Sequence, residues 1–93
     1  MGKPVVMDFY ADWCGPCKMM DPILEELEAR LGDQVEIQRI DVDTSEGLQK
    51  AQKYRIQYVP TLIIEKDGEM KEKLVGVQDL EQLQDRLQPL VEG

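Results

Sequence analysis

The strongest constraint on the fold is the order in which strand-type and helix-type hydrophobic patterns follow one another along the chain. Residues 4–10, PVVMDFY, form an apolar run interrupted only by Asp8, which is typical of a buried strand. Residues 17–31 then space their apolar side chains three and four apart, which predicts an amphipathic helix that ends at Gly32. The chain therefore opens with a strand that leads directly into a helix.

The middle of the chain repeats this alternation. Residues 34–43 predict a second strand, and residues 44–54 predict a short helix. The apolar side chains of Leu48, Ala51 and Tyr54 are expected on the inward face of that helix. We expect the first two strands to be parallel and joined by a right-handed crossover.

The last third of the chain predicts a hairpin and a helix. Two strands, at residues 61–65 and 69–75, flank the turn sequence Lys-Asp-Gly at 66–68. Residues 79–90 then place leucines on one helical face, with Asp79 as the expected N-cap. The order β-α-β-α-β-β-α predicts an α/β fold with a four-stranded mixed sheet and helices on both faces.

The size and charge of the chain narrow its class. Its 93 residues, 42% apolar and 32% charged, predict one soluble domain over residues 1–93, which we expect to be a monomer. A net charge of −8 argues against a nucleic-acid partner, because phosphate backbones require clustered Lys and Arg. No segment approaches the roughly 18 apolar residues of a membrane span or resembles a secretory signal. We therefore expect a cytoplasmic protein with no membrane partner.

Both cysteines of the chain, Cys14 and Cys17, flank a Gly-Pro pair where the first strand gives way to the helix. As a structural clamp, a bridge between them would close a loop of about four residues, worth roughly 2 kcal/mol, and would join no distant elements. As zinc ligands they need two further donors, and the chain has no histidine. A dimer that shares four cysteines, or a site completed by carboxylates, stays open as an alternative. We expect no metal and no other cofactor.

Redox chemistry fits the position of the two cysteines best. Helix N–H groups and the positive end of the helix dipole stabilise a thiolate at Cys14, and the thiolate is the form that attacks disulfides. Gly15 and Pro16 are expected to leave that sulfur unobstructed, and Pro16 lacks an N–H that a first helical turn would leave unpaired. Cys17, one turn deeper, can then attack Cys14 and release the reduced target.

Two segments resemble the signature sequences of the thioredoxin family: MDFYADWCGPCKMMDPIL at residues 7–24 and YVPTLIIEKDG at residues 58–68. Both segments lie in the expected element order, so the resemblance covers nearly the whole chain. It implies the thioredoxin fold in its minimal form. It also implies a thiol–disulfide oxidoreductase that reduces disulfides in target proteins and is recycled by a thioredoxin reductase or another electron donor.

The resemblance further implies a role for each residue of the cysteine loop. Cys14 corresponds to the family's nucleophile and Cys17 to its resolving thiol. Trp13 corresponds to the aromatic residue at the rim of the site, with a buried core position as the alternative. Gly15 and Pro16, between the cysteines, are expected to contact the target protein.

The resemblance also implies a peptide groove beside the cysteines. Pro60 corresponds to the family's cis-proline, which keeps a backbone N–H away from the sulfurs. Val59 would offer its backbone to an extended target peptide, and Gly76 and Val77 would line the opposite wall. For Val59 and Val77 the alternative is ordinary packing.

Asp8 is the sharpest local anomaly, because a carboxylate inside a buried strand is costly unless it is paired or neutralised. Burial raises a carboxyl pKa toward neutrality, which suits a group that takes up and returns a proton. By the resemblance, Asp8 sits below Cys17 and assists its deprotonation. The alternative is a solvated carboxylate at the strand end that caps a nearby helix or loop. Arg39 stands where the family usually has lysine, and arginine holds its charge more firmly.

The sequence also departs from the family pattern. It begins just before the family's central strand, so the first strand and first helix of larger members are expected to be absent. That leaves the strand at residues 35–41 at an open edge of the sheet. Tyr58 replaces a small residue beside the groove, and Glu65 replaces an apolar one.

Three other functions remain open from the sequence. The first is a glutaredoxin-like protein that takes electrons from glutathione, although Gly-Pro between the cysteines favours the thioredoxin type. The second is a redox-inert binding module that uses the same groove. The third is a disulfide-forming oxidant of an exported compartment, which would need a targeting segment that is not visible.

Overall fold

The buried run at the start of the chain forms strand β1, Val5–Tyr10, one of the two inner strands of a four-stranded sheet. The computed structural model describes residues 2–92. After β1 the elements are α1 (Gly15–Leu31), a short 3-10 helix η1 (Gly32–Gln34), β2 (Glu36–Asp41), α2 (Ser45–Lys53), β3 (Thr61–Lys66), β4 (Glu69–Val75) and α3 (Leu80–Glu92). The predicted order of strands and helices is confirmed.

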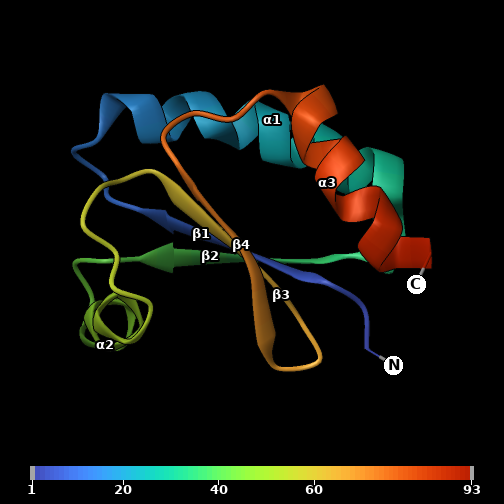
Figure 1. The fold of residues 1–93 in the computed structure, drawn as a ribbon. Coiled ribbons are helices and arrows are strands. Elements are labelled where there is room, and N and C mark those ends of the chain that lie inside the picture. The colour runs from blue at the N-terminus through green and yellow to red at the C-terminus, as the bar shows by residue number, and fades with distance from the viewer. Residues whose placement is uncertain (1, 93) are drawn as a thin grey trace.

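The strands lie in the order β2-β1-β3-β4, which puts β2 and β4 at the edges of the sheet. β1 is parallel to β2 and antiparallel to β3, and β3 is antiparallel to β4. Helices α1 and α3 cover one face of the sheet, and α2 lies on the other (Figure 1). The mixed sheet, the helices on both faces and the open edge at the second strand are therefore confirmed.

β1 supplies both sides of the hydrophobic core, because its successive side chains point to opposite faces of the sheet. Val6 belongs to the buried cluster formed with helices α1 and α3. Met7 and Phe9 belong to a second cluster with Ala51 of α2. Full burial of one such side chain stabilises the fold by about 1.5–3 kcal/mol. Asp8, in the same row as Val6, therefore faces α1.

Local signals fix the ends of the elements as the sequence predicted. Gly32 ends α1 with a φ of 52°, a conformation that residues with a side chain rarely adopt. Asp67 and Gly68, with φ of 55° and 78°, form the two-residue turn whose twist suits a hairpin. At the start of α3, a carboxylate oxygen of Asp79 accepts a hydrogen bond from the N–H of Gln82 at 3.2 Å, so the predicted N-cap is confirmed.

Helix α2 corrects one prediction. Leu48 is 51% exposed instead of facing inward, whereas Ala51 is buried and Tyr54 is half-buried. The reason is a contact through small residues: Gly47 is buried so closely against β2 that a Cβ atom there would overlap the backbone carbonyl oxygen of Asp41. The face that holds Gly47 and Ala51 therefore lies on the sheet, and Leu48 is left beside it.

Both ends of the described chain lie at the end of the sheet opposite the loop that joins β1 to α1 (Figure 1). The backbone N–H of Gly2 donates a hydrogen bond to the Asp67 carboxylate in the hairpin turn at 2.8 Å. The Lys66 ammonium group donates to the backbone carbonyl of Leu90, near the end of α3. The ends of the chain are thus held beside the hairpin, away from the cysteines.

Candidate active site

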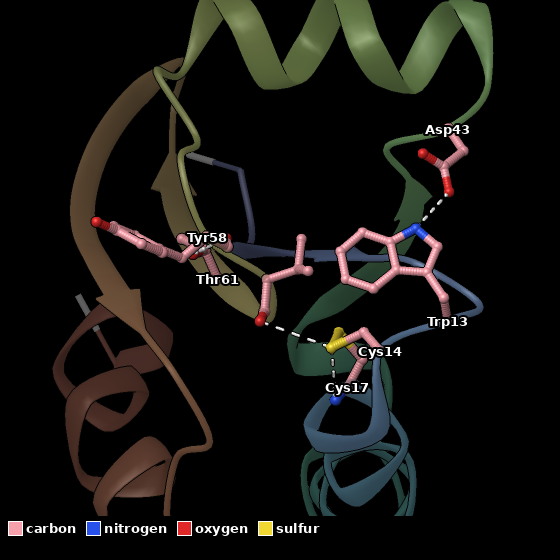
Figure 2. Close-up of a disulfide and its surroundings, with 7 residues drawn as sticks. Trp13, Cys14, Cys17, Asp43, Tyr58 and Thr61 are labelled. Carbon is pink, nitrogen blue, oxygen red and sulfur yellow. Dashed lines mark hydrogen bonds between the residues drawn. A yellow bond between two sulfur atoms is a disulfide. The ribbon is translucent and has the colours of Figure 1, made fainter.

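The loop after β1 places the two cysteines at the start of α1, as predicted. Cys14 is the N-cap in an extended conformation, and a disulfide bond joins it to Cys17, with the two Cα atoms 5.3 Å apart (Figure 2). The sulfur of Cys14 accepts a hydrogen bond from the backbone N–H of Cys17 at 3.1 Å. After reduction, this N–H and the positive end of the helix dipole both favour a negative charge on the Cys14 sulfur.

The sulfur is less open than the sequence predicted. In this disulfide form Cys14 is 4% exposed and Cys17 is 3% exposed. The expectation that Gly15 and Pro16 leave the Cys14 sulfur unobstructed concerns these two residues alone, and neither of them covers the cysteines. Gly15 and Pro16 are themselves exposed, and the cover comes from a distant segment, because the half-buried Val59 packs against the cysteine cluster.

The segment between α2 and β3 faces the disulfide. The Val59–Pro60 peptide bond is cis, as the family resemblance implied. The carbonyl oxygen of Val59 lies 3.6 Å from the Sγ atom of Cys14. A disulfide sulfur has no hydrogen to donate, whereas the thiol of a reduced Cys14 can donate a hydrogen bond to this oxygen. The backbone of Val59 is thus directly beside the cysteine pair.

The segment between β4 and α3 forms the next wall of the site. The N–H of Gly76 donates to the carbonyl oxygen of Pro60 at 2.8 Å, and the φ of Gly76 is 91°, which favours glycine. Val77 is 41% exposed, so ordinary core packing does not describe it. The N–H of Gln78 donates to the sulfur of Met20 in α1 at 3.2 Å. The segments around the cysteine pair are therefore hydrogen-bonded to one another and to α1.

Trp13 lies at the rim of the site. Its side chain is 73% exposed, so the alternative of a core position is wrong. The indole Nε1–H donates a hydrogen bond to a carboxylate oxygen of Asp43, between β2 and α2, at 3.0 Å (Figure 2). Trp13, Leu48 and Tyr58 also line a hollow of about 460 Å³ that reaches Val59. Three large exposed side chains around one hollow make a surface that suits apolar groups.

Asp8 is buried, with 1% of its surface exposed, and neither carboxylate oxygen has a hydrogen-bond partner within residues 2–92. The alternative of a solvated, capping carboxylate is therefore wrong. Burial raises the pKa of Asp8 to about 6; the guanidinium of Arg39 opposes this rise and the carboxylate of Asp21 adds to it. A carboxyl group with this pKa can take up and release a proton near neutral pH.

A second cavity, of about 200 Å³, lies beside Cys17 and is lined in part by Lys18, Asp21 and Arg39. Asp21 and Arg39 form an ion pair, with Oδ1 and Nη1 2.7 Å apart. Asp21 is absent from the sequence-based predictions. A signal for it exists, because residues four apart share a helical face and Asp21 follows Cys17 at that spacing. Asp43 is also absent from them, and no local pattern marks it.

Metal ligands do not gather within residues 2–92, where no group of three or more His, Cys, Asp or Glu side chains is arranged to hold an ion. The two sulfurs, which a soft metal would require, are bonded to each other. In the same part of the chain, no helix is both long and apolar enough to cross a membrane.

A cysteine pair that forms a disulfide at the N-terminus of a helix, beside a cis-proline segment of a mixed four-stranded sheet, defines a thiol–disulfide oxidoreductase. The family model described as Thioredoxin matches residues 1–89, and the chain belongs to the thioredoxin family. Proteins of this family are disulfide oxidoreductases that act on disulfide-containing targets and are reduced by thioredoxin reductase.

Individual relatives agree with this assignment. The thioredoxin of Bacillus subtilis is 49% identical over 81 residues, which cover 87% of this chain and 76% of the relative. A thioredoxin-like protein of Synechocystis is 45% identical over 89 residues, which cover 96% of this chain and 83% of the relative. Among solved structures, oxidised mitochondrial thioredoxin 3 of Saccharomyces cerevisiae has a TM-score of 0.83 at 36% identity, over 97% of this chain and 81% of its own. A mutant thioredoxin of Halobacterium salinarum has a TM-score of 0.86 at 40% identity, over 99% of this chain and 78% of its own.

Proposed function

We propose that this protein reduces disulfides in target proteins, with Cys14 as the nucleophile and Cys17 as the resolving thiol. The observation that carries the proposal is the position of the Cys14 sulfur. This sulfur lies at the N-terminus of α1 and faces the Val59 backbone. It accepts a hydrogen bond from the backbone N–H of Cys17 at 3.1 Å. The Cys17 N–H and the helix N-terminus stabilise a thiolate, and the Val59 backbone beside it is a segment on which a peptide can lie.

In the first step the Cys14 thiolate attacks one sulfur of the target disulfide. The target S–S bond breaks, a mixed disulfide forms between Cys14 and the target, and the second target sulfur leaves as a thiolate that takes a proton from solvent. The N–H of Cys17 and the dipole of α1 favour the thiolate that makes this attack. The charge moves from a sulfur stabilised by the helix to a sulfur that solvent can protonate.

In the second step Cys17 resolves the mixed disulfide. Asp8 accepts the proton of the Cys17 thiol, and the resulting thiolate attacks the sulfur of Cys14. The Cys14–Cys17 disulfide forms, and the first target sulfur leaves as a thiolate, which takes up a proton. The target has then gained two electrons and two protons, and Asp8 returns its proton to solvent. The pKa of Asp8, about 6, suits both proton steps near neutral pH.

The target peptide lies across the exposed rim of the cysteine loop. Gly15 has open space where a Cβ would stand, and Pro16 is exposed, so a peptide can approach the loop closely. Val59 offers backbone groups on one side, and the exposed Val77 follows Gly76 on the other. Trp13 at the rim adds an apolar surface that contacts side chains flanking the target disulfide.

The protein works as one domain over residues 1–93, as a monomer, in the reducing cytoplasm, with a thioredoxin reductase as electron donor. All four strands share one sheet, which supports a single domain. Stable structural disulfides are rare in the cytoplasm, and a Cys-x-x-Cys pair in a cytoplasmic protein is typically catalytic. The proposed redox role of Cys14 and Cys17 is therefore consistent with a cytoplasmic setting. Sedimentation analysis tests the monomer, and recycling by thioredoxin reductase against recycling by glutathione tests the donor.

The decisive experiment is insulin reduction by the wild type and by two matched variants. We expect the wild type to reduce insulin and Cys14→Ser to lose the activity. We expect Cys17→Ser to accumulate a covalent mixed disulfide with insulin, because the resolving thiol is missing. A wild type that reduces nothing, with target binding unaffected by Cys14→Ser, contradicts the proposal and favours a binding module. Efficient recycling by glutathione alone indicates a glutaredoxin-like protein.

A further inference from the structure

Three charged groups from three elements meet on the α1 face of the sheet. Asp8 of β1 and Arg39 of β2 are register partners on parallel strands, so both side chains leave the same face. Asp21 of α1 closes the group, with its Oδ1 atom 2.7 Å from Nη1 of Arg39. Asp21 and Arg39 also line the cavity of about 200 Å³ whose wall includes Cys17.

The three groups differ sharply in exposure. Asp8 is 1% exposed and has no hydrogen-bond partner within residues 2–92. The side chains of Arg39 and Asp21 are 37% and 51% exposed. The Arg39 guanidinium thus stands near two carboxylates and forms an ion pair with the exposed one. Such a solvent-exposed pair contributes little to stability, whereas a charge beside a buried carboxyl group acts on it strongly.

We propose that Asp21 is a positioning residue for proton transfer between Cys17 and Asp8, and that it acts by pairing with the guanidinium of Arg39 and offsetting its charge at the mouth of the cavity. The inference rests on the proposed function, in which Asp8 accepts the Cys17 proton. Asp21 offsets the positive charge that would otherwise favour ionisation of Asp8, so Asp8 keeps its proton to a higher pH. Asp21, which lies in the same helix α1 as Cys17, thereby raises the proton affinity of Asp8.

The surroundings of Asp8 support this assignment. Arg39 lowers the pKa of Asp8 and Asp21 raises it, as the geometry requires. Other titratable or charged groups near this end of the α1 face are Tyr10, Asp12 and Lys18, which line the same cavity as Cys17. On β3, the register partner of Asp8 is the apolar Leu62. The main charges that act on Asp8 are therefore the two members of the ion pair.

Two variants and one matched control test the proposal. Asp21→Asn removes the carboxylate that offsets the charge of Arg39, and Arg39→Gln removes the guanidinium itself. Glu26→Gln is the control, because it removes one carboxylate from the same helix and breaks an exposed pair with Arg30, whose side chains are 41% and 53% exposed. The measurements are the NMR titration of the Asp8 carboxyl carbon and the pH profile of insulin reduction.

We expect Asp21→Asn to lower the Asp8 midpoint by about half a pH unit or more and Arg39→Gln to raise it by a similar amount. Glu26→Gln is expected to leave it unchanged. Because Asp21 and Arg39 are exposed, added salt should narrow the difference between Asp21→Asn and the wild type. A purely structural disturbance does not move the two variants in opposite directions.

An Asp8 midpoint that is equal in Asp21→Asn and the wild type overturns the proposal, and so does an equal shift in Glu26→Gln. A failed proposed function gives a different result, because the wild type then reduces no insulin at any pH. In that case the NMR midpoints alone still decide whether Asp21 and Arg39 control the proton on Asp8.

Discussion

Replacing Asp8 by asparagine should make the protein more stable at neutral pH and slower in disulfide exchange. In the folded state, burial raises the pKa of Asp8 from 3.8 to about 6. The folded state therefore binds the proton more tightly than the unfolded state, and the free energy of unfolding falls as pH rises between about 4 and about 6. Above that range the buried carboxylate is ionised at a cost that asparagine does not carry.

The size of the effect follows from the two pKa values. A difference of about two units corresponds to about 3 kcal/mol of lost stability at pH 7, at about 1.4 kcal/mol per unit. A buried asparagine without hydrogen-bond partners has its own cost of about 1–3 kcal/mol, at every pH. The net gain of Asp8→Asn at pH 7 is thus about 0–2 kcal/mol, which raises the melting temperature by up to roughly 15 °C for a domain of this size.

Denaturant unfolding of both proteins at pH 7 and near pH 3 isolates the ionisation of Asp8. The cost of the buried amide cancels, so the advantage of Asp8→Asn should be about 3 kcal/mol larger at pH 7 than near pH 3. Asp33→Asn, in the exposed part of η1, is the control and should show no such difference. An advantage of Asp8→Asn that is the same at both pH values would refute the reasoning.

The same variant should lose the proton acceptor for Cys17. We expect the resolving step to slow by about tenfold or more at pH 7, since general-base catalysis typically contributes 100-fold or more. The decay of a mixed disulfide preformed on Cys14 measures this step directly. Unchanged decay at neutral pH would remove Asp8 from the mechanism, whatever the stability data show.

Three further substitutions test the packing and the rim. Gly47→Ala should destabilise by about 1–3 kcal/mol, because its Cβ overlaps the Asp41 carbonyl; a gain in denaturant midpoint, the usual result in a helix, would contradict the close contact. Phe9→Ala, which empties a fully buried site, should lower the free energy of unfolding by about 3–5 kcal/mol, and a loss below 1 kcal/mol would contradict it. Asp43→Ala should release the Trp13 indole, shifting its fluorescence and raising the KM for insulin about twofold to fivefold with kcat unchanged; identical emission would show that the hydrogen bond does not hold the ring.

The sequence predicted best those elements in which the residues that form the hydrophobic pattern are also the residues that pack in the core. The leucines of α1 both form its apolar face and fill the core, and Gly32 ends the helix because its positive φ excludes most other residues. Helix α2 was misassigned at Leu48 because the hydrophobic pattern gives weight to large side chains. Its contact with β2 is made instead through Gly47, where no side chain fits, and through Ala51.

At the site, the cysteine pair and Asp8 were predictable because each breaks the pattern around it. The cover over Cys14 was not predictable, because it comes from Val59, 45 residues away, and depends on how β3 joins the sheet. The ion pair between Asp21 and Arg39 was missed for the same reason. It requires the rotation of a helix and the register of a strand to agree, and neither residue alone carries that information.

The placement of both chain ends beside the hairpin determines how the domain can be attached to another protein. A larger body attached through either end would lie at the end of the sheet opposite the cysteine loop and leave the sulfurs free to meet a substrate (Figure 1). A short flexible tether would then present the dithiol to disulfides on the attached body at an effective concentration of the order of millimolar, whatever its bulk abundance. The domain can in this way supply electrons to disulfides of any protein to which it is attached.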